Sequence, residues 1–171
     1  MGKKKGGKGG NVEKAGKADR KLKKLLAEIG EADIKDILKL RNTVAPCNVS
    51  RAQFVSCTPP SPRCNMSMSS HPERDELIFF GGEYFNGSKA TMFDDLFQYK
   101  IKNREWSQFV APVDQARPLP RCSHQAVMSP LGGGQLWVFG GEFASPSQLQ
   151  FHHFNDLWTF HLKENRWEQI R

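Results

Sequence analysis

The sequence predicts an all-β fold, in which two four-stranded antiparallel units follow a basic N-terminal arm. The main observation is a run of β-branched and aromatic residues that ends in two glycines. It occurs twice, as Glu76-Leu-Ile-Phe-Phe-Gly-Gly-Glu83 and as Gln135-Leu-Trp-Val-Phe-Gly-Gly-Glu142. Such a run is typical of a buried strand that ends in a tight turn with positive φ. The chain therefore contains two copies of one strand-and-turn element.

The same landmarks flank both copies, which is the second observation. Pro-Arg-Cys precedes each run, starting at Pro62 and Pro120, and Asp-Leu-aromatic follows each run. Each unit then closes on a tryptophan, Trp106 or Trp167. Equivalent landmarks are about 60 residues apart, and their small drift indicates insertions in loops. The repeat is therefore a whole structural unit and not a single strand.

The arm that precedes the repeats is strongly basic. The chain has a formal net charge of +7, and the excess lies mainly in its first 24 residues. Residues 1–17 form a Gly/Lys tail that is too polar to build a core, so we expect them to be disordered. Residues 18–41 carry leucine and isoleucine at helical spacing, which predicts two short amphipathic helices, over about 19–29 and 31–40.

Two interpretations of the lysines in the arm remain open. A run of like charge is usually a solvated tail, but it also suits binding to RNA, DNA or another polyanion. The candidate polyanion-binding residues are Lys3, Lys4, Lys5, Lys8, Lys21, Lys23 and Lys24.

Residues 42–60 contain several prolines and read as a linker, with residues 53–55 suited to a short strand. The first unit spans residues 61–109. Its predicted strands are 65–69, 76–80, 95–101 and 106–109, and residues 83–93 are its longest loop. The alternation in the third strand places Phe97, Tyr99 and Ile101 toward the core.

Residues 110–118 connect the two units, and the second unit spans residues 119–171. It repeats the order of the first. Its predicted strands are 123–128, 136–139, 156–162 and 167–170, with a long loop at 142–154. Four antiparallel strands in a unit of this length are the plan of one β-propeller blade.

The glycine doublet, the aromatic residue of the third strand and the closing tryptophan together resemble the kelch repeat. The signature residues are Gly81, Gly82, Tyr99, Trp106, Gly140, Gly141, Phe160 and Trp167. The resemblance implies two blades of an incomplete β-propeller. Propellers have four to eight blades, so we expect the remaining blades in a C-terminal part beyond Arg171, with ring assembly from several copies as the alternative.

The resemblance also implies a non-enzymatic scaffold that binds a protein partner. Some kelch propellers are catalytic, but this sequence lacks a convergent set of catalytic groups, and we expect neither catalysis nor a cofactor. His152, His153 and His161 do not have metal-ligand spacing, and the adjacent pair Ser123 and His124 would point to opposite faces of a strand. Binding of RNA or another polyanion by the arm is the alternative function.

The basic start is not followed by an apolar segment, which predicts neither a signal peptide nor a membrane partner. We therefore expect an intracellular protein, cytoplasmic or nuclear, whose four cysteines are reduced.

An aromatic set on the two long loops gives the candidate partner-binding rim, because aromatic residues are favoured anchors of protein interfaces. The set is Tyr84, Phe85, Phe143, Phe151, His152 and Phe154. Packing of these rings against the neighbouring blade is the alternative. Arg63 and Arg121 could line a central channel, but their recurrence together with Asp95 and Asp156 favours two structural ion pairs.

Overall fold

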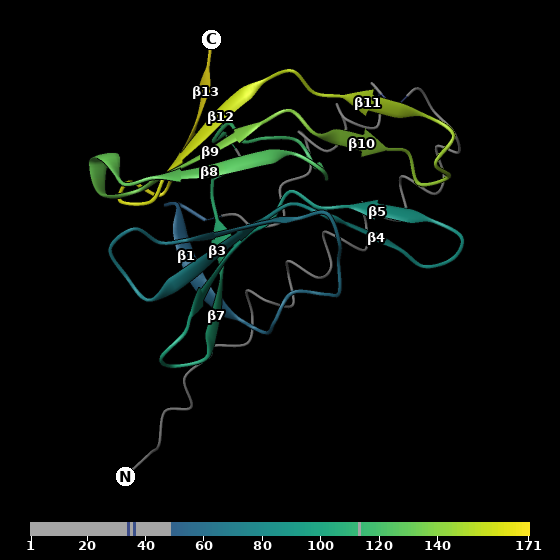
Figure 1. The fold of residues 1–171 in the computed structure, drawn as a ribbon. Helices are drawn as coiled ribbons and strands as arrows, with labels where there is room; N and C mark the ends of the chain where they lie inside the picture. Colours follow the sequence, from purple (N-terminus) through teal and green to yellow (C-terminus); the bar gives the residue numbers. More distant parts are fainter. Residues whose placement is uncertain (1–33, 35, 37–48, 113) are drawn as a thin grey trace.

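The computed structural model of the chain describes residues 34, 36, 49–112 and 114–171. Their two larger antiparallel sheets lie one above the other (Figure 1), and two further sheets are two-stranded hairpins. The first sheet has the strand order β1-β7-β6-β3-β2. Its strands are β1 (Gln53–Cys57), β2 (Ser67–Ser70), β3 (Glu76–Phe80), β6 (Leu96–Lys100) and β7 (Glu105–Val110). The four strands predicted from the first repeat are all present, each within two residues of its predicted start.

The second sheet has the order β13-β12-β9-β8. Its strands are β8 (Gln125–Ser129), β9 (Gln135–Phe139), β12 (Leu157–His161) and β13 (Arg166–Ile170), and a short 3₁₀ helix, η1 (Leu131–Gly133), joins β8 to β9. The order matches β7-β6-β3-β2 of the first sheet strand for strand. The prediction of an all-β fold built from antiparallel blades is therefore confirmed.

The first blade has a fifth strand that the repeat pattern did not predict. β1 pairs antiparallel with β7, in a register that sets Phe54 opposite Phe109. The short strand suggested at residues 53–55 is therefore present as Gln53–Cys57, and it belongs to the first blade although these residues were placed within the linker 42–60. The ring of Phe54 lies 5.6 Å from that of Phe109 and 6.2 Å from that of Phe160 in the other blade. β1 is thus paired with a strand about 50 residues further along the chain. A short apolar stretch of sequence does not reveal such a distant pairing.

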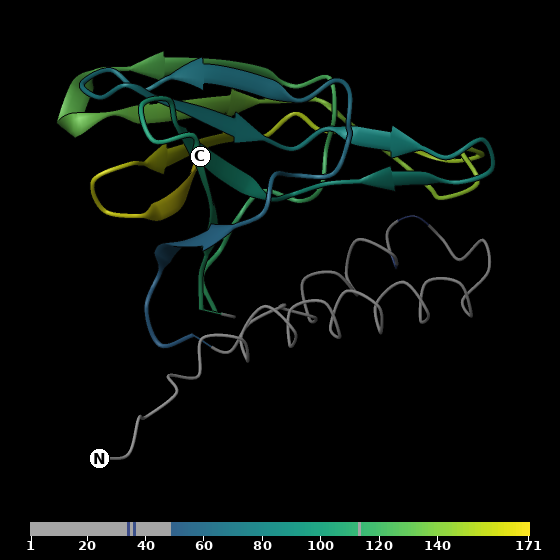
Figure 2. The same cartoon turned by 90° about the horizontal axis from the view of Figure 1, so that it is seen from below.

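The long loops of both repeats are β-hairpins. β4 (Glu83–Phe85) pairs with β5 (Ala90–Met92), and β10 (Glu142–Ala144) pairs with β11 (Phe151–His153). Both hairpins project from the same end of the two sheets, as Figures 1 and 2 show. The end of the molecule that carries the hairpins is called the rim below.

The main core fills the space between the two sheets. Ile78, Phe80 and Leu96 of the first blade are 1% exposed, and they pack against Phe160 and Trp167 of the second. The ring of Trp167 lies 5.0 Å from Phe80 and 5.1 Å from Phe160. Full burial of such side chains stabilises the fold by about 1.5–3 kcal/mol each, so this interface is a major source of stability.

The prediction that Ile101 faces the core is wrong. Ile101 is 49% exposed because it lies in the turn after β6, where the strand alternation no longer applies. Phe97 is buried as predicted, at 6%, and Tyr99 is half-buried. Leu96 and Gln98, on the opposite face of β6, are also buried, because that face is covered by the second blade.

The predictions for residues 1–17, and for most of 18–41, lie outside the described residues, as do the seven candidate polyanion-binding lysines. Ile34 and Asp36 are described, and both are helical, within the span where the second short helix was predicted. In the described part of the chain, no helix is long and apolar enough to cross a membrane.

Candidate partner-binding rim

Each hairpin starts directly after two glycines whose backbone conformation strongly disfavours any other residue. Gly81 and Gly82 have φ values of +68° and +97°, and Gly140 and Gly141 have +66° and +88°. A Cβ atom on Gly81 would lie 2.6 Å from the carbonyl oxygen of Arg121. The doublet therefore lets the chain turn out of the sheet while it touches the backbone of the next blade.

A buried arginine braces the base of the second hairpin. Arg121 is fully buried, and its guanidinium donates to both carboxylate oxygens of Asp156, at 2.7 and 3.0 Å. It also donates to the carbonyl oxygen of Gly140 at 2.9 Å and lies 4.0 Å from the centre of the Phe154 ring. One side chain thus ties together the glycine turn, the start of β12 and the end of the hairpin.

Arg63 makes the equivalent contacts in the first blade. It pairs with Asp95, donates to the carbonyl oxygen of Gly81 at 3.3 Å and lies 3.8 Å from the centre of the Phe93 ring. The prediction that the two arginines pair with the recurring aspartates is confirmed. Their side chains are only 4% and 0% exposed, so neither offers its charge to a channel.

The two aspartates differ in their electrostatics. Burial raises the pKa of Asp95, and the hydrogen bond from Arg63 offsets this effect only in part. Burial also opposes ionisation of Asp156, but hydrogen bonds from Arg121 and Trp158 outweigh it and lower the pKa of that carboxyl. The Trp158 indole N–H donates to Asp156 at 2.7 Å, so this carboxylate accepts from Trp158 as well as from Arg121.

The remaining signature residues lie inside the sheets and not on the rim. Tyr99 stands opposite Trp106 with their rings 4.8 Å apart, and Phe160 stands opposite Trp167. These cross-strand aromatic pairs join the third and fourth strands of each blade, as the repeat positions imply.

The exposed part of the rim is a small apolar surface on the two hairpins. Tyr84 is 45% exposed, Phe85 49% and Phe151 53%, and Leu149 beside the last of these is 72% exposed. The hairpins are joined by a hydrogen bond of 2.8 Å from the backbone N–H of Ala90 to the carbonyl oxygen of Pro146. The exposed rings are therefore carried by two hairpins that support each other.

Three of the six aromatic residues predicted for this rim are not free to serve as anchors. Phe143 is only 3% exposed, because it packs between the bases of the two hairpins, so its assignment to the partner-binding set is wrong. Phe154 is half-buried and covers Arg121. His152 is also half-buried, with its ring 4.8 Å from that of Phe154.

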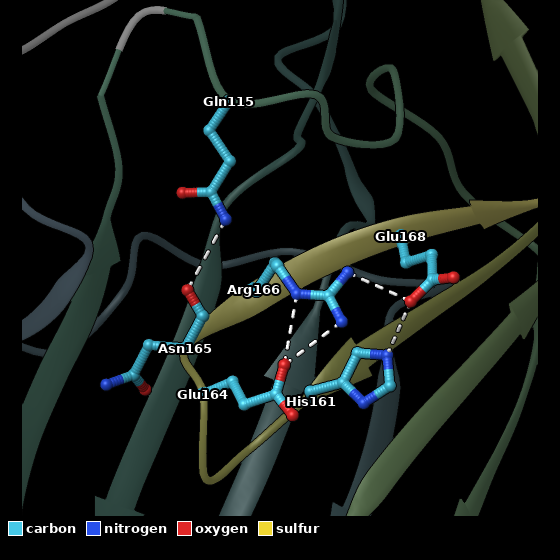
Figure 3. A network of polar contacts seen from close by, with 6 residues as sticks. All are labelled: Gln115, His161, Glu164, Asn165, Arg166 and Glu168. Carbon is cyan, nitrogen blue, oxygen red and sulfur yellow. Dashed lines mark hydrogen bonds and ion pairs between the residues drawn. The ribbon is translucent and has the colours of Figure 1, made fainter.

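The other histidines of the second blade have protein partners. His161 Nε2 lies 3.0 Å from Glu168, which also accepts a bond from Arg166, and Arg166 in turn binds Glu164 (Figure 3). His153 lies 3.4 Å from Glu142. Among the described residues, no three His, Cys, Asp or Glu side chains gather in a way that could hold a metal ion.

Sequence reasoning missed one polar contact at the blade interface. His124 Nε2 lies 2.8 Å from Ser67 Oγ of the other blade, and the ring packs edge-on against Phe80. His124 is 7% exposed, and burial, assisted by the charge of Arg121, lowers its pKa to about 4. The adjacent Ser123 lies before β8 in a bend with φ of +55°, and its Oγ contacts Cys122 Sγ at 3.9 Å. The true partner of His124 precedes it by 57 residues, so no local motif could identify it.

Two stacked antiparallel sheets with equivalent strands, glycine turns and closing tryptophans define neighbouring blades of a β-propeller. Residues 35–171 match the KLHDC2/KLHL20/DRC7 Kelch-repeats domain. The chain belongs to the kelch-repeat family. Domains of this family generally serve as protein-interaction scaffolds and are generally non-enzymatic.

Individual relatives are similar only over part of their length. The leucine-zipper-like transcriptional regulator 1 homolog of Drosophila melanogaster is 29% identical over 117 residues, which are 66% of this chain and 11% of the relative. Acyl-CoA-binding domain-containing protein 5 of Arabidopsis thaliana is 37% identical over 84 residues, 49% of this chain and 11% of the relative. Human multiple epidermal growth factor-like domains protein 8 is 28% identical over 95 residues, which are 54% of this chain and 3% of the relative. The chain thus spans about a tenth of the first two.

Proposed function

We propose that this chain is a non-enzymatic scaffold that binds a protein partner through its rim hairpins. The observation that carries the proposal is the exposure of Tyr84, Phe85 and Phe151 on two hairpins that are held from below by arginine–aspartate pairs. Aromatic side chains on a rigid support are the usual anchors of protein interfaces, because they bury much area and lose little conformational entropy.

The test compares substitutions on the rim with substitutions of apolar residues elsewhere that are more exposed still. One variant carries Tyr84→Ser, Phe85→Ser and Phe151→Ser, and the control carries Val127→Ser and Leu131→Ser, whose side chains are 67% and 69% exposed. Proteins that co-purify with the tagged chain are quantified for each. We expect a defined set of partners to be lost at least tenfold from the rim variant and kept by the control. Equal losses from both variants would contradict the proposal.

The alternative function, polyanion binding through the arm, is supported by the concentration of lysine in residues 1–24. Phosphate contacts by about ten basic groups would make binding to single-stranded RNA fall steeply as salt rises. Fluorescence anisotropy at several salt concentrations measures this dependence, with a variant that lacks residues 1–24 as the control. Binding that is insensitive to salt, or that survives the deletion, would exclude the arm as the binding element.

Three finer proposals concern the identity and location of the protein. We propose that the chain is related to kelch domain-containing protein 4, because residues 80–87, 120–125 and 133–146 resemble its opening blades and the arm is lysine-rich in both. We expect further blades after Arg171, and an intracellular location in cytoplasm or nucleus. Sequencing the transcript beyond residue 171 tests the first two proposals, since further Gly-Gly and Trp units must follow. Imaging of the tagged protein tests the third.

A further inference from the structure

A second buried apolar cluster lies where β5 of the first hairpin meets β10 of the second. Its walls come from both hairpins and from the segment between the blades, namely Met92, Cys122, Phe143 and Ala144, with Leu119 and Phe154 at its edge. Cys122 adds no charge to the cluster, since burial, reinforced by the carboxylate of Glu83, raises the pKa of its thiol to about 12. This apolar recess is separate from the core between the sheets.

The recess is filled by a residue of the N-terminal arm. Ile34 is 8% exposed and packs directly in the cluster. Its backbone N–H donates to Gln150 Oε1 of the second hairpin, at 3.0 Å, across 116 residues of sequence. Ile34 therefore contributes both an aliphatic side chain and a backbone donor to the rim, as a bound peptide would.

We infer that the recess is a docking site for an aliphatic side chain on a short helical segment, and that the arm occupies it in cis through Ile34. The inference goes beyond the proposed function and does not depend on partner binding by the exposed rings. Both described residues of the docked segment are helical, and Asp36 is exposed while Ile34 is buried. Residues two apart on a helix point to roughly opposite sides, so Ile34 faces the recess while Asp36 faces solvent, as expected for a helix docked by one side.

Release of Ile34 from the recess should leave the core between the two sheets intact. The main core contains residues of the two sheets and none of Ile34's neighbours in the recess. A covalently attached segment has an effective concentration in the millimolar range, so the cis occupant would exclude a weaker peptide. A partner that presents an isoleucine or leucine on a helix would have to displace the arm, which makes the recess a regulated binding site.

The experiment uses the full chain and a fluorescent peptide with the sequence of residues 29–41. Ile34→Asp in the chain should release the arm and free the recess, because a carboxylate is not tolerated in an apolar site. By fluorescence anisotropy, we expect the peptide to bind the Ile34→Asp chain at least tenfold more tightly than the unmodified chain. A peptide that itself carries Ile34→Asp should bind neither chain.

Matched variants separate docking from a general effect on the fold. Adding Gln150→Ala to the Ile34→Asp chain should weaken peptide binding about fivefold, the usual effect of one neutral hydrogen bond. In a chain with Ile34→Leu, the recess should stay occupied by the arm of the same chain. Tyr84→Ser with Phe151→Ser should leave peptide binding unchanged, so failure of the rim proposal and failure of this one are distinguishable. Equal binding by the Ile34→Asp and unmodified chains, or no binding by either, would overturn the inference.

Hydrogen exchange on the unmodified chain gives a reading that does not depend on how the Ile34→Asp variant folds. The amide of Ile34 should exchange more slowly in the chain than in the free peptide, and Gln150→Ala should speed its exchange. Exchange at the rate of the free peptide would show that the recess is not occupied in cis.

Discussion

The protonation state of His124 bears directly on the contact between the blades. It lies against Phe80, Ser67 and the carbonyl-bearing turn at Gly81, close to the charge of Arg121. Its Nδ1 atom is buried and has no hydrogen-bond partner among the described residues. A protonated ring would place an additional charge in this space, so the folded state holds the neutral form.

The free energy of unfolding should therefore fall in mild acid. The unfolded chain protonates His124 near its ordinary pKa of 6.5, whereas the folded chain does so only near 4. Between these values the unfolded state binds one more proton, which lowers stability by up to about 1.4 kcal/mol for each pH unit. His124→Met, which installs the residue that Met66 supplies at the equivalent position of the first repeat, should remove this part of the slope.

Urea denaturation between pH 7.5 and 4 measures the difference between the two proteins, and the effect should level off below about pH 4. If the free energies of unfolding of the two proteins change in parallel with pH across this range, His124 is not buried in its neutral form.

The glycine turns allow a second comparison at the scale of one residue. Gly81 and Gly87 both have positive φ, at +68° and +91°, but only Gly81 would clash, because no atom lies within 4 Å of a Cβ on Gly87. Gly87→Ala should cost about 1 kcal/mol for the backbone conformation alone. Gly81→Ala should cost about 2 kcal/mol more, because the turn must move away from Arg121. Thermal unfolding of both variants distinguishes strain from crowding.

At the scale of elements, the arginine–aspartate pairs hold each hairpin to its blade. Arg121→Met should destabilise the protein by about 3 kcal/mol, because Asp156 would be left as an unpaired, largely buried charge. Adding Asp156→Asn removes that charge while keeping an oxygen for the Trp158 indole, so the double variant should regain part of the loss. A double-mutant cycle in urea measures the coupling, and additive losses would contradict a direct interaction.

At the scale of the whole molecule, the repeat makes Phe80 and Phe139 equivalent, but their environments differ. Phe80 is 1% exposed against the second blade, whereas Phe139 is 51% exposed on the outer face of that blade. Phe80→Ala should therefore cost about 3–5 kcal/mol and Phe139→Ala less than about 1.5 kcal/mol. Urea denaturation of this 171-residue chain tests the pair. Similar costs would mean that the outer face of the second blade is also covered.

Local sequence determined the four repeated strands of each blade, the glycine turns and the repeat itself. β3 and β9 can be predicted from the sequence, because a short apolar run and a glycine doublet are properties of a few adjacent residues. The ion pairs Arg63–Asp95 and Arg121–Asp156 could also be predicted, although their members are distant, because both members recur together in each repeat.

Only the tertiary structure decided which of these residues face solvent and what meets across the blades. Tyr84 and Phe143 occupy equivalent positions in the two repeats, yet Tyr84 is exposed and Phe143 is buried in the recess between the hairpins. β1 joins the first blade, and Ile34 reaches Gln150, through pairings between distant segments. Burial and long-range pairing depend on how whole sheets and hairpins pack, and no short window of sequence contains that information.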